Sequence, residues 1–156
     1  MKTRVFAILL SVLMLAGVFS ACGTVDNSDV VAADVYNDLI SAVEFPEMLA
    51  LDSEGLLSFV GINSSLYTEA VAYIPLTAVS GDMIFIIKVA DEASAEEVAA
   101  KLEGYRLNVL AQMNNYIPAE YEKINAASVE TDGSFVWLVV SSYQDDAVAS
   151  VSANLK

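Results

Sequence analysis

Apolar residues recur at helical spacing in four parts of this chain. The first part follows Ser28 or Asp29, either of which can cap a helix, and it ends before Pro46. The second covers residues 51–60, and Gly61 stands just beyond it, where helices commonly end. These two patterns predict a helix of about four turns and then a short helix near the start of the folded domain.

The longest helical pattern begins at Ser94, which forms a capping box with Glu97, and stops at Pro118. The fourth begins at about Asp145, where neighbouring acidic residues suit the positive end of a helix dipole. The long helix is predicted to face the core through one apolar stripe, which consists of Val98, Leu102, Tyr105, Val109, Met113 and Tyr116.

Strand patterns occur in two pairs. Residues 69–76 and 83–89 are rich in β-branched and aromatic side chains, and a break containing Gly81 separates them, which predicts an antiparallel pair. After a turn over residues 118–122, residues 126–131 and 134–142 form the second pair. Its loop is Asp132-Gly133, a dipeptide typical of a type I′ hairpin, and this loop predicts a register with Thr131 opposite Ser134 and Val129 opposite Val136.

The elements therefore follow the order α-α-β-β-α-β-β-α. This order predicts an α+β fold in which a four-stranded, largely antiparallel sheet packs against helices. Residues 30–156 are long enough to form a single domain with its own core, without help from metal ions or disulfides.

The aromatic residues of the last strand allow two interpretations. If helices cover only one face of the sheet, Phe135 and Trp137, with Tyr73 or Tyr143, form an exposed patch suited to a peptide, glycan or protein partner. If helices cover both faces, these side chains belong to the core, and this interpretation is preferred. Lys88 shares a strand face with isoleucines, so it either reaches water or a carboxylate such as Glu69 or Asp82, or has a functional role in this patch.

The N-terminus has the composition of an export signal. Lys2 and Arg4 precede an apolar run from Val5 to Val18, which has the length of a signal-peptide core and is short for a membrane-spanning helix. Residues 19–23, Phe-Ser-Ala-Cys-Gly, resemble a bacterial lipobox, in which small residues precede a cysteine that becomes lipid-modified. We therefore expect residues 1–21 to be a lipoprotein signal peptide, Cys22 to carry the lipid, including palmitate, and residues 22–29 to be a short tether.

Composition excludes several classes of chemistry. The chain contains no histidine and one cysteine, so catalysis by a Ser-His-Asp or Cys-His arrangement, histidine-ligated zinc and intrachain disulfides are absent. The acidic clusters lack the ligand spacing of a calcium loop, and no nucleotide-binding motif is present, so we expect no metal and no cofactor. Once Lys2 and Arg4 leave with the leader, five basic residues face 21 acidic ones, a formal −16, which argues against binding to nucleic acid.

Several stretches resemble a known bacterial family. They are residues 81–88 (Gly-Asp-Met-Ile-Phe-Ile-Ile-Lys), Arg106 in the long helix, the Tyr-Ile-Pro break at 116–118, residues 121–124 (Tyr-Glu-Lys-Ile) and residues 132–136 (Asp-Gly-Ser-Phe-Val). Together they resemble domain of unknown function 4358, a family of bacterial lipoproteins, over about residues 30–150. The resemblance implies an exported, usually lipid-anchored protein, and it brings no catalytic residues with it.

These features predict a lipid-anchored protein on the extracytoplasmic face of the cell membrane. We expect its domain to be a non-catalytic binding or interaction module, whose partner is an envelope protein, a peptide or a glycan. One alternative is a small histidine-independent hydrolase or a carboxylate-dependent enzyme that acts on glycans. Another is a structural accessory subunit of an envelope assembly.

Overall fold

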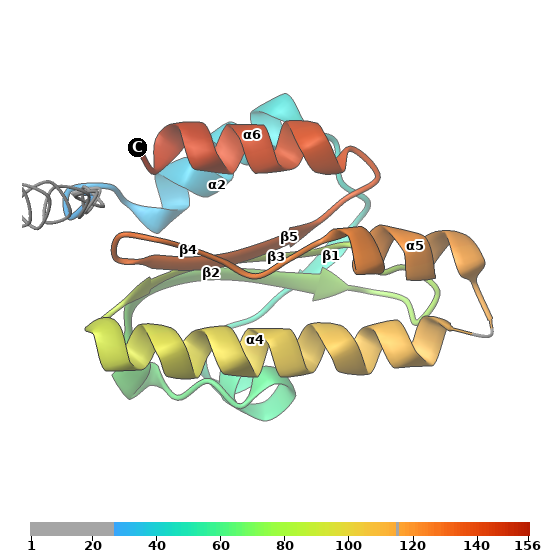
Figure 1. Ribbon diagram of the computed structural model, residues 1–156, viewed down its shortest axis with the longest axis horizontal. Helices are drawn as coiled ribbons and strands as arrows, with labels where there is room; N and C mark the ends of the chain where they lie inside the picture. The colour runs from blue at the N-terminus through green and yellow to red at the C-terminus, as the bar shows by residue number, and fades with distance from the viewer. Residues whose placement is uncertain (1–26, 115) are drawn as a thin grey trace, which may run out of the picture.

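A five-stranded antiparallel sheet lies between two layers of helices. The computed structural model describes residues 27–114 and 116–156 (Figure 1). Helices α2 (Ala32–Ala42) and α6 (Gln144–Asn154) cover one face of the sheet, and helix α4 (Glu92–Met113) covers the other (Figure 1). Because both faces are covered, the sheet is the middle layer of the domain.

The strands are ordered β1-β2-β3-β5-β4 across the sheet, and every neighbouring pair is antiparallel. The predicted α+β class with an antiparallel sheet is confirmed, but the predicted number of four strands is wrong. The additional strand, β1, has only three residues and follows Pro46 closely, so it is too short to show an alternating pattern. The strands are β1 (Met48–Ala50), β2 (Tyr67–Pro75), β3 (Met83–Val89), β4 (Glu130–Asp132) and β5 (Phe135–Val140).

The predicted short helix over residues 51–60 is present in two parts, α3 (Ser53–Gly55) and a single π-helical turn, η1 (Leu56–Val60). A 3₁₀ turn, η2 (Ser64–Leu66), follows and leads into β2. The predicted turn over residues 118–122 is wrong, because helix α5 (Pro118–Ala126) occupies this segment. Proline suits the first turn of a helix because the backbone N–H that it lacks has no partner there, so Pro118 begins α5 as well as marking the break after α4.

The long helix starts earlier than the capping box predicts. Asp91 is its N-cap, and its Oδ1 accepts a hydrogen bond of 2.8 Å from the backbone N–H of Ser94. Ser94 itself is buried within the first turn of α4. The predicted apolar stripe is buried or half-buried up to Met113, but Tyr116 lies beyond the end of the helix and is 85% exposed.

The β4–β5 hairpin has a different register from the predicted one. Asp132 pairs with Phe135, so Gly133 and Ser134 are the two residues of the turn. Gly133 has a φ of 56°, and no non-glycine residue among those described has a positive φ. A single positive φ at the first turn position matches type II′ rather than type I′. The register differs by two residues, so each side chain keeps its predicted face but has a new partner: Thr131 lies opposite Val136.

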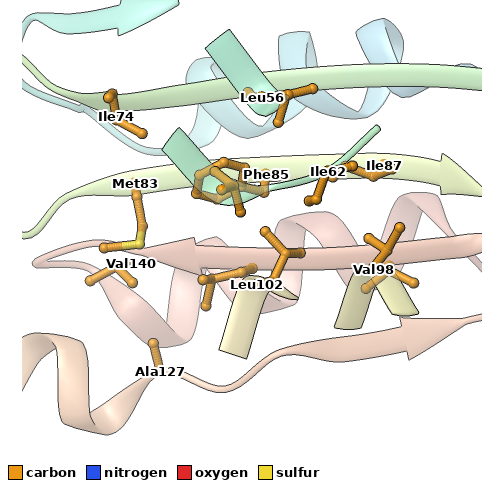
Figure 2. Close-up of a cluster of buried hydrophobic side chains, with 14 of the residues drawn as sticks. Leu56, Ile62, Ile74, Met83, Phe85, Ile87, Val98, Leu102, Ala127 and Val140 are labelled. Carbon is orange, nitrogen blue, oxygen red and sulfur yellow. The ribbon is translucent and has the colours of Figure 1, made fainter. Parts of the chain in front are cut away.

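The central strands carry apolar side chains on both faces, and these form two cores. Phe85 and Leu138 belong to the core beneath α4. Figure 2 shows part of this core, with Leu102 and Val98 of α4 beside Phe85 and Ile87 of β3. The ring of Phe85 also makes an edge-on contact with Tyr105, with the ring centroids 5.7 Å apart. The second core lies beneath α2 and α6, and it contains the alternate residues of the same strands, Ile84, Ile86, Phe135, Trp137 and Val139.

Candidate functional site

The predicted lipidation residue, Cys22, and the predicted leader lie outside the described residues. The described chain begins at Asn27, which is only 3% exposed. Residues 27–29 were predicted to belong to the tether, but the structure attaches this segment to the folded domain through the contacts of Asn27 and Lys88.

Asn27 joins three separate parts of the fold. Its Nδ2 donates hydrogen bonds to the backbone carbonyls of Asp132 at 2.8 Å and Leu155 at 3.2 Å. Its Oδ1 accepts two further bonds, from the backbone N–H and the hydroxyl of Ser134, both at 2.9 Å. Both donors and both acceptor lone pairs of this buried amide are therefore used, which is what a buried polar side chain requires.

Lys88 holds the residues that follow Asn27. Its Nζ donates to the backbone carbonyls of Ser28 at 2.5 Å and Val30 at 2.8 Å, and it lies 3.5 Å from Oε1 of Glu69. The other oxygen of Glu69 accepts a bond of 2.9 Å from the backbone N–H of Ala32, the first residue of α2. The pairing of Lys88 with Glu69, one of its two expected partners, is confirmed. We call Asn27, Glu69 and Lys88 the N-terminal clamp.

Phe135 and Trp137, the other residues of the predicted binding patch, are close to Lys88 but are not on the surface. Lys88 Nζ lies 5.7 Å from the centroid of the Phe135 ring, and both aromatic side chains are at most 1% exposed beneath α2 and α6. Trp137 Nε1 donates to Oδ2 of Asp132 at 3.2 Å. The three residues thus form no exposed patch, because helices cover both faces of the sheet, and the core interpretation describes Phe135 and Trp137.

Arg106 is engaged by neighbouring groups of the fold. Its Nε and one terminal nitrogen donate to the two carboxylate oxygens of Glu103, at 2.8 and 2.6 Å, and its other terminal nitrogen donates to the carbonyl of Ile124 at 3.0 Å. The bonds from Arg106 hold the pKa of the Glu103 carboxyl below its usual value. Arg106 therefore ties α4 to the C-terminal end of α5.

A second polar cluster on α5 surrounds Lys123 and Glu120. Lys123 Nζ lies 2.7 Å from Oδ2 of Asp82 and 2.7 Å from Oε2 of Glu120. Glu120 also accepts from the backbone N–H of Gly81 at 2.6 Å, and Ser80 donates to Asp82 at 2.6 Å. These contacts join α5 to the loop between β2 and β3, so this cluster too has a structural role.

A cavity of about 360 Å³ opens between the C-terminal half of α2 and the edge strand β1. The rings of Tyr36 and Tyr73 stack there, with centroids 4.8 Å apart and planes 8° apart. Burial, and then a hydrogen bond with Tyr73, raise the pKa of Tyr36 to about 12. We call this cavity the Tyr36 groove; its lining is Tyr36, Ile40, Val43, Glu44, Phe45, Pro46, Met48, Tyr73 and Ile84.

No pattern in the sequence predicts the Tyr36 groove. Tyr36 and Ile40 are four residues apart on one side of a helix, a spacing that any amphipathic helix shows. Tyr73 was considered only as a neighbour of Trp137. The sequence does not predict that α2 packs beside β1 and β2, because this packing depends on how the chain crosses the sheet.

The described residues contain neither a membrane-spanning helix nor a cluster of metal ligands. Within residues 27–114 and 116–156, no helix combines the length and the apolar character needed to cross a bilayer. In the same part of the chain, no three side chains of the His, Cys, Asp and Glu types come together in a way that could hold a metal ion.

Comparison with known proteins places the chain in a family. Searches of curated proteins and of solved structures gave no significant match. A family model described as a domain of unknown function (DUF4358) matches residues 41–141, which is more than half of the chain and extends from the end of α2 to the end of β5. The chain therefore belongs to the DUF4358 family, as the resemblance of its sequence motifs indicated.

Proposed function

We propose that this protein is an exported bacterial lipoprotein that a lipid on Cys22 holds at the extracytoplasmic face of the cell membrane. The observation that carries the proposal is the arrangement of the N-terminus. A basic start and an apolar run end at the one cysteine of the chain, which small residues precede. The N-terminal clamp agrees with it, because Asn27, which the fold holds in place, comes five residues after this cysteine. A diacylglycerol with a further acyl chain is enough for stable attachment.

The Cys22→Ala variant tests this anchoring. The full chain is produced in a bacterial host supplied with radiolabelled palmitate, and the cells are separated into membrane and soluble fractions. We expect the variant to lose the label. We also expect cleaved protein to be missing from its membrane fraction. The Ser20→Ala variant is the matched control, since it keeps a small residue before the cysteine and should be labelled normally. Label retained in Cys22→Ala would contradict the proposal.

We further propose that the domain is a non-catalytic binding module whose contact surface is the Tyr36 groove. Its volume lies within the usual range of ligand pockets, near the lower limit, and its aromatic rings provide a rigid apolar surface. The absence of catalysis is supported by the engagement of Lys88, Arg106 and Lys123 in contacts that join elements of the fold. Exposed Ile40, 44% accessible, extends the apolar surface of the groove.

Crosslinking in intact cells, followed by affinity capture, tests the binding surface. We expect Ile40→Asp to reduce capture of a crosslinked partner strongly, because it introduces a charge that loses hydration at the contact. Leu57→Asp is the matched control: Leu57 is 50% exposed in η1, on the α4 side of the sheet, and its change should leave capture unaffected. Equal capture by both variants would exclude the groove as the contact surface.

A further inference from the structure

The N-terminal clamp lies at one end of the sheet, together with the first turn of α4. Asn27 binds the β4–β5 turn through Ser134 and the C-terminal end of the chain through Leu155. A cavity of about 650 Å³ separates this segment from the start of α4, and its lining includes Asn27, Gly133, Asp91 and Glu92. In Figure 1 the first described residues, in blue, lie at the same end as the β4–β5 turn and the yellow-green start of α4.

The opposite end of the molecule is about 33 Å away. Helix α4 has 22 residues and starts beside the clamp, so at 1.5 Å per residue its length carries the chain about 33 Å to Met113. Tyr116 follows there, and the bond between Gly81 and Glu120 brings the β2–β3 loop to the same end. Exposed apolar side chains gather on the loops at this far end: Leu76, Val79, Tyr116 and Tyr143.

The chain between Cys22 and Asn27 is too short to let the domain turn over. It comprises five Cα–Cα steps, which span at most about 18 Å even when fully extended. For the domain to stand inverted, with α4 upright and the far loops on the bilayer, the clamp would have to lie about 33 Å from the membrane, which is nearly twice that reach. The acidic residues near the clamp, Asp29, Asp91 and Glu92, are repelled by anionic headgroups, so the short lipid-anchored chain, and not electrostatic adsorption, is what keeps this end near the bilayer.

From these distances we propose that the N-terminal clamp orients the domain on the membrane, with the β4–β5 turn and the start of α4 nearest the bilayer and the far loops directed away from it. This inference rests on the proposed lipidation of Cys22. It deepens the proposed function, because it places the Tyr36 groove, whose lining residues Tyr73 and Ile84 lie near the β2–β3 loop, toward the end of the domain that faces the aqueous side.

Energy transfer to the membrane tests the orientation in the full, membrane-bound chain. Glu92→Cys and Tyr116→Cys, made separately, place a single reactive thiol at each end of α4, since lipid blocks the thiol of Cys22. Each is labelled with the same maleimide donor dye, and the membranes receive a lipid-borne acceptor dye. The measured quantity is the transfer efficiency of the Glu92 position divided by that of the Tyr116 position, which we expect to exceed one.

The matched control lengthens the chain before the clamp. About twenty Gly and Ser residues inserted between Val25 and Asp26 add roughly 25 Å of average reach, so the ratio should fall toward one. A ratio at or below one with the natural length would overturn the orientation while the protein stays lipid-labelled and membrane-bound. Absence of label, with the protein in the soluble fraction, would instead overturn the lipidation and the orientation with it.

Discussion

Single buried polar residues of this protein connect segments that are far apart in the sequence. Asn27 bonds to residues 105 and 128 positions away, and Lys88 bonds to carbonyls 58 and 60 positions away. The pairing of Lys88 with Glu69 could be predicted, because the two residues lie on adjacent strands that the pattern also predicts to pair. The role of Asn27 could not, since an asparagine before a helix is an ordinary feature of loops.

Replacing Asn27 with alanine should destabilise the fold by about 2 to 3 kcal/mol, because it leaves the buried N–H of Ser134 and the carbonyl of Leu155 without their partner. Urea unfolding of the wild-type and variant proteins measures this difference. Asn37→Ala is the control. Asn37 is exposed on α2, and alanine is favoured in helices, so the stability of this variant should equal that of the wild type or rise slightly. Equal midpoints for Asn27→Ala and the wild type would show that the amide bonds contribute nothing.

At the scale of elements, long amphipathic patterns predict the presence of helices and strands well, whereas the residues at which these elements begin and end are predicted less well. Strand β3 has the predicted bounds, and α4 is present close to its predicted length. The start of α4 was misplaced because both Asp91 and Ser94 are good capping residues, and only tertiary packing buries Ser94. The hairpin was misplaced because Gly133 can occupy either position of a two-residue turn, and the bonds of Asn27 to Ser134 and Asp132 favour one of them.

The cap of α4 should give the protein a measurable dependence on pH. Hydrogen bonds from Ser94, chiefly from its backbone N–H, hold the pKa of Asp91 below its usual value of 3.8. Because the folded pKa is lowered, this contribution to stability is complete above pH 3.8 and is lost as the pH falls through the folded pKa.

The Asp91→Asn variant isolates this effect, since asparagine caps a helix about as well but does not titrate. We expect the stability gap between wild type and variant to shrink or reverse in favour of the variant between pH 6 and pH 3, as measured by urea unfolding at both values. Asp38→Asn, at an exposed position on α2, controls for the loss of one negative charge. A gap that does not change with pH would contradict the assigned role of Asp91.

At the scale of the whole molecule, the covered sheet decides what the aromatic residues of β5 do. All six residues of this strand are buried, which explains why its sequence shows no alternation of apolar and polar positions. Such a continuous run indicates a strand buried on both faces, in agreement with the core interpretation of Phe135 and Trp137. The Tyr36 groove depends on the packing of four elements, α2, β1, β2 and β3, and no comparable sequence pattern predicts it.

Trp137→Ala should cost about 3 to 5 kcal/mol of stability, the range for truncating a large buried aromatic side chain. Thermal unfolding followed by circular dichroism measures the loss, and Trp137→Phe is the control, because it keeps most of the apolar volume and should lose less. A folded Trp137→Ala domain with the stability of the wild type would show that this face is not a packed core.

The two outermost strands of the sheet, β1 and β4, have three residues each. Short edges offer few free backbone groups to a neighbouring chain, and charges along them oppose pairing of one sheet with another. Glu47 and Asp52 flank β1, while Glu130 and Asp132 lie on β4 itself, so two copies that meet edge to edge bring carboxylates together. Molecules confined to a surface collide far more often than molecules free in solution. For the lipid-anchored protein that we propose, short, acidic edges would therefore let many copies share one membrane without growing into aggregates.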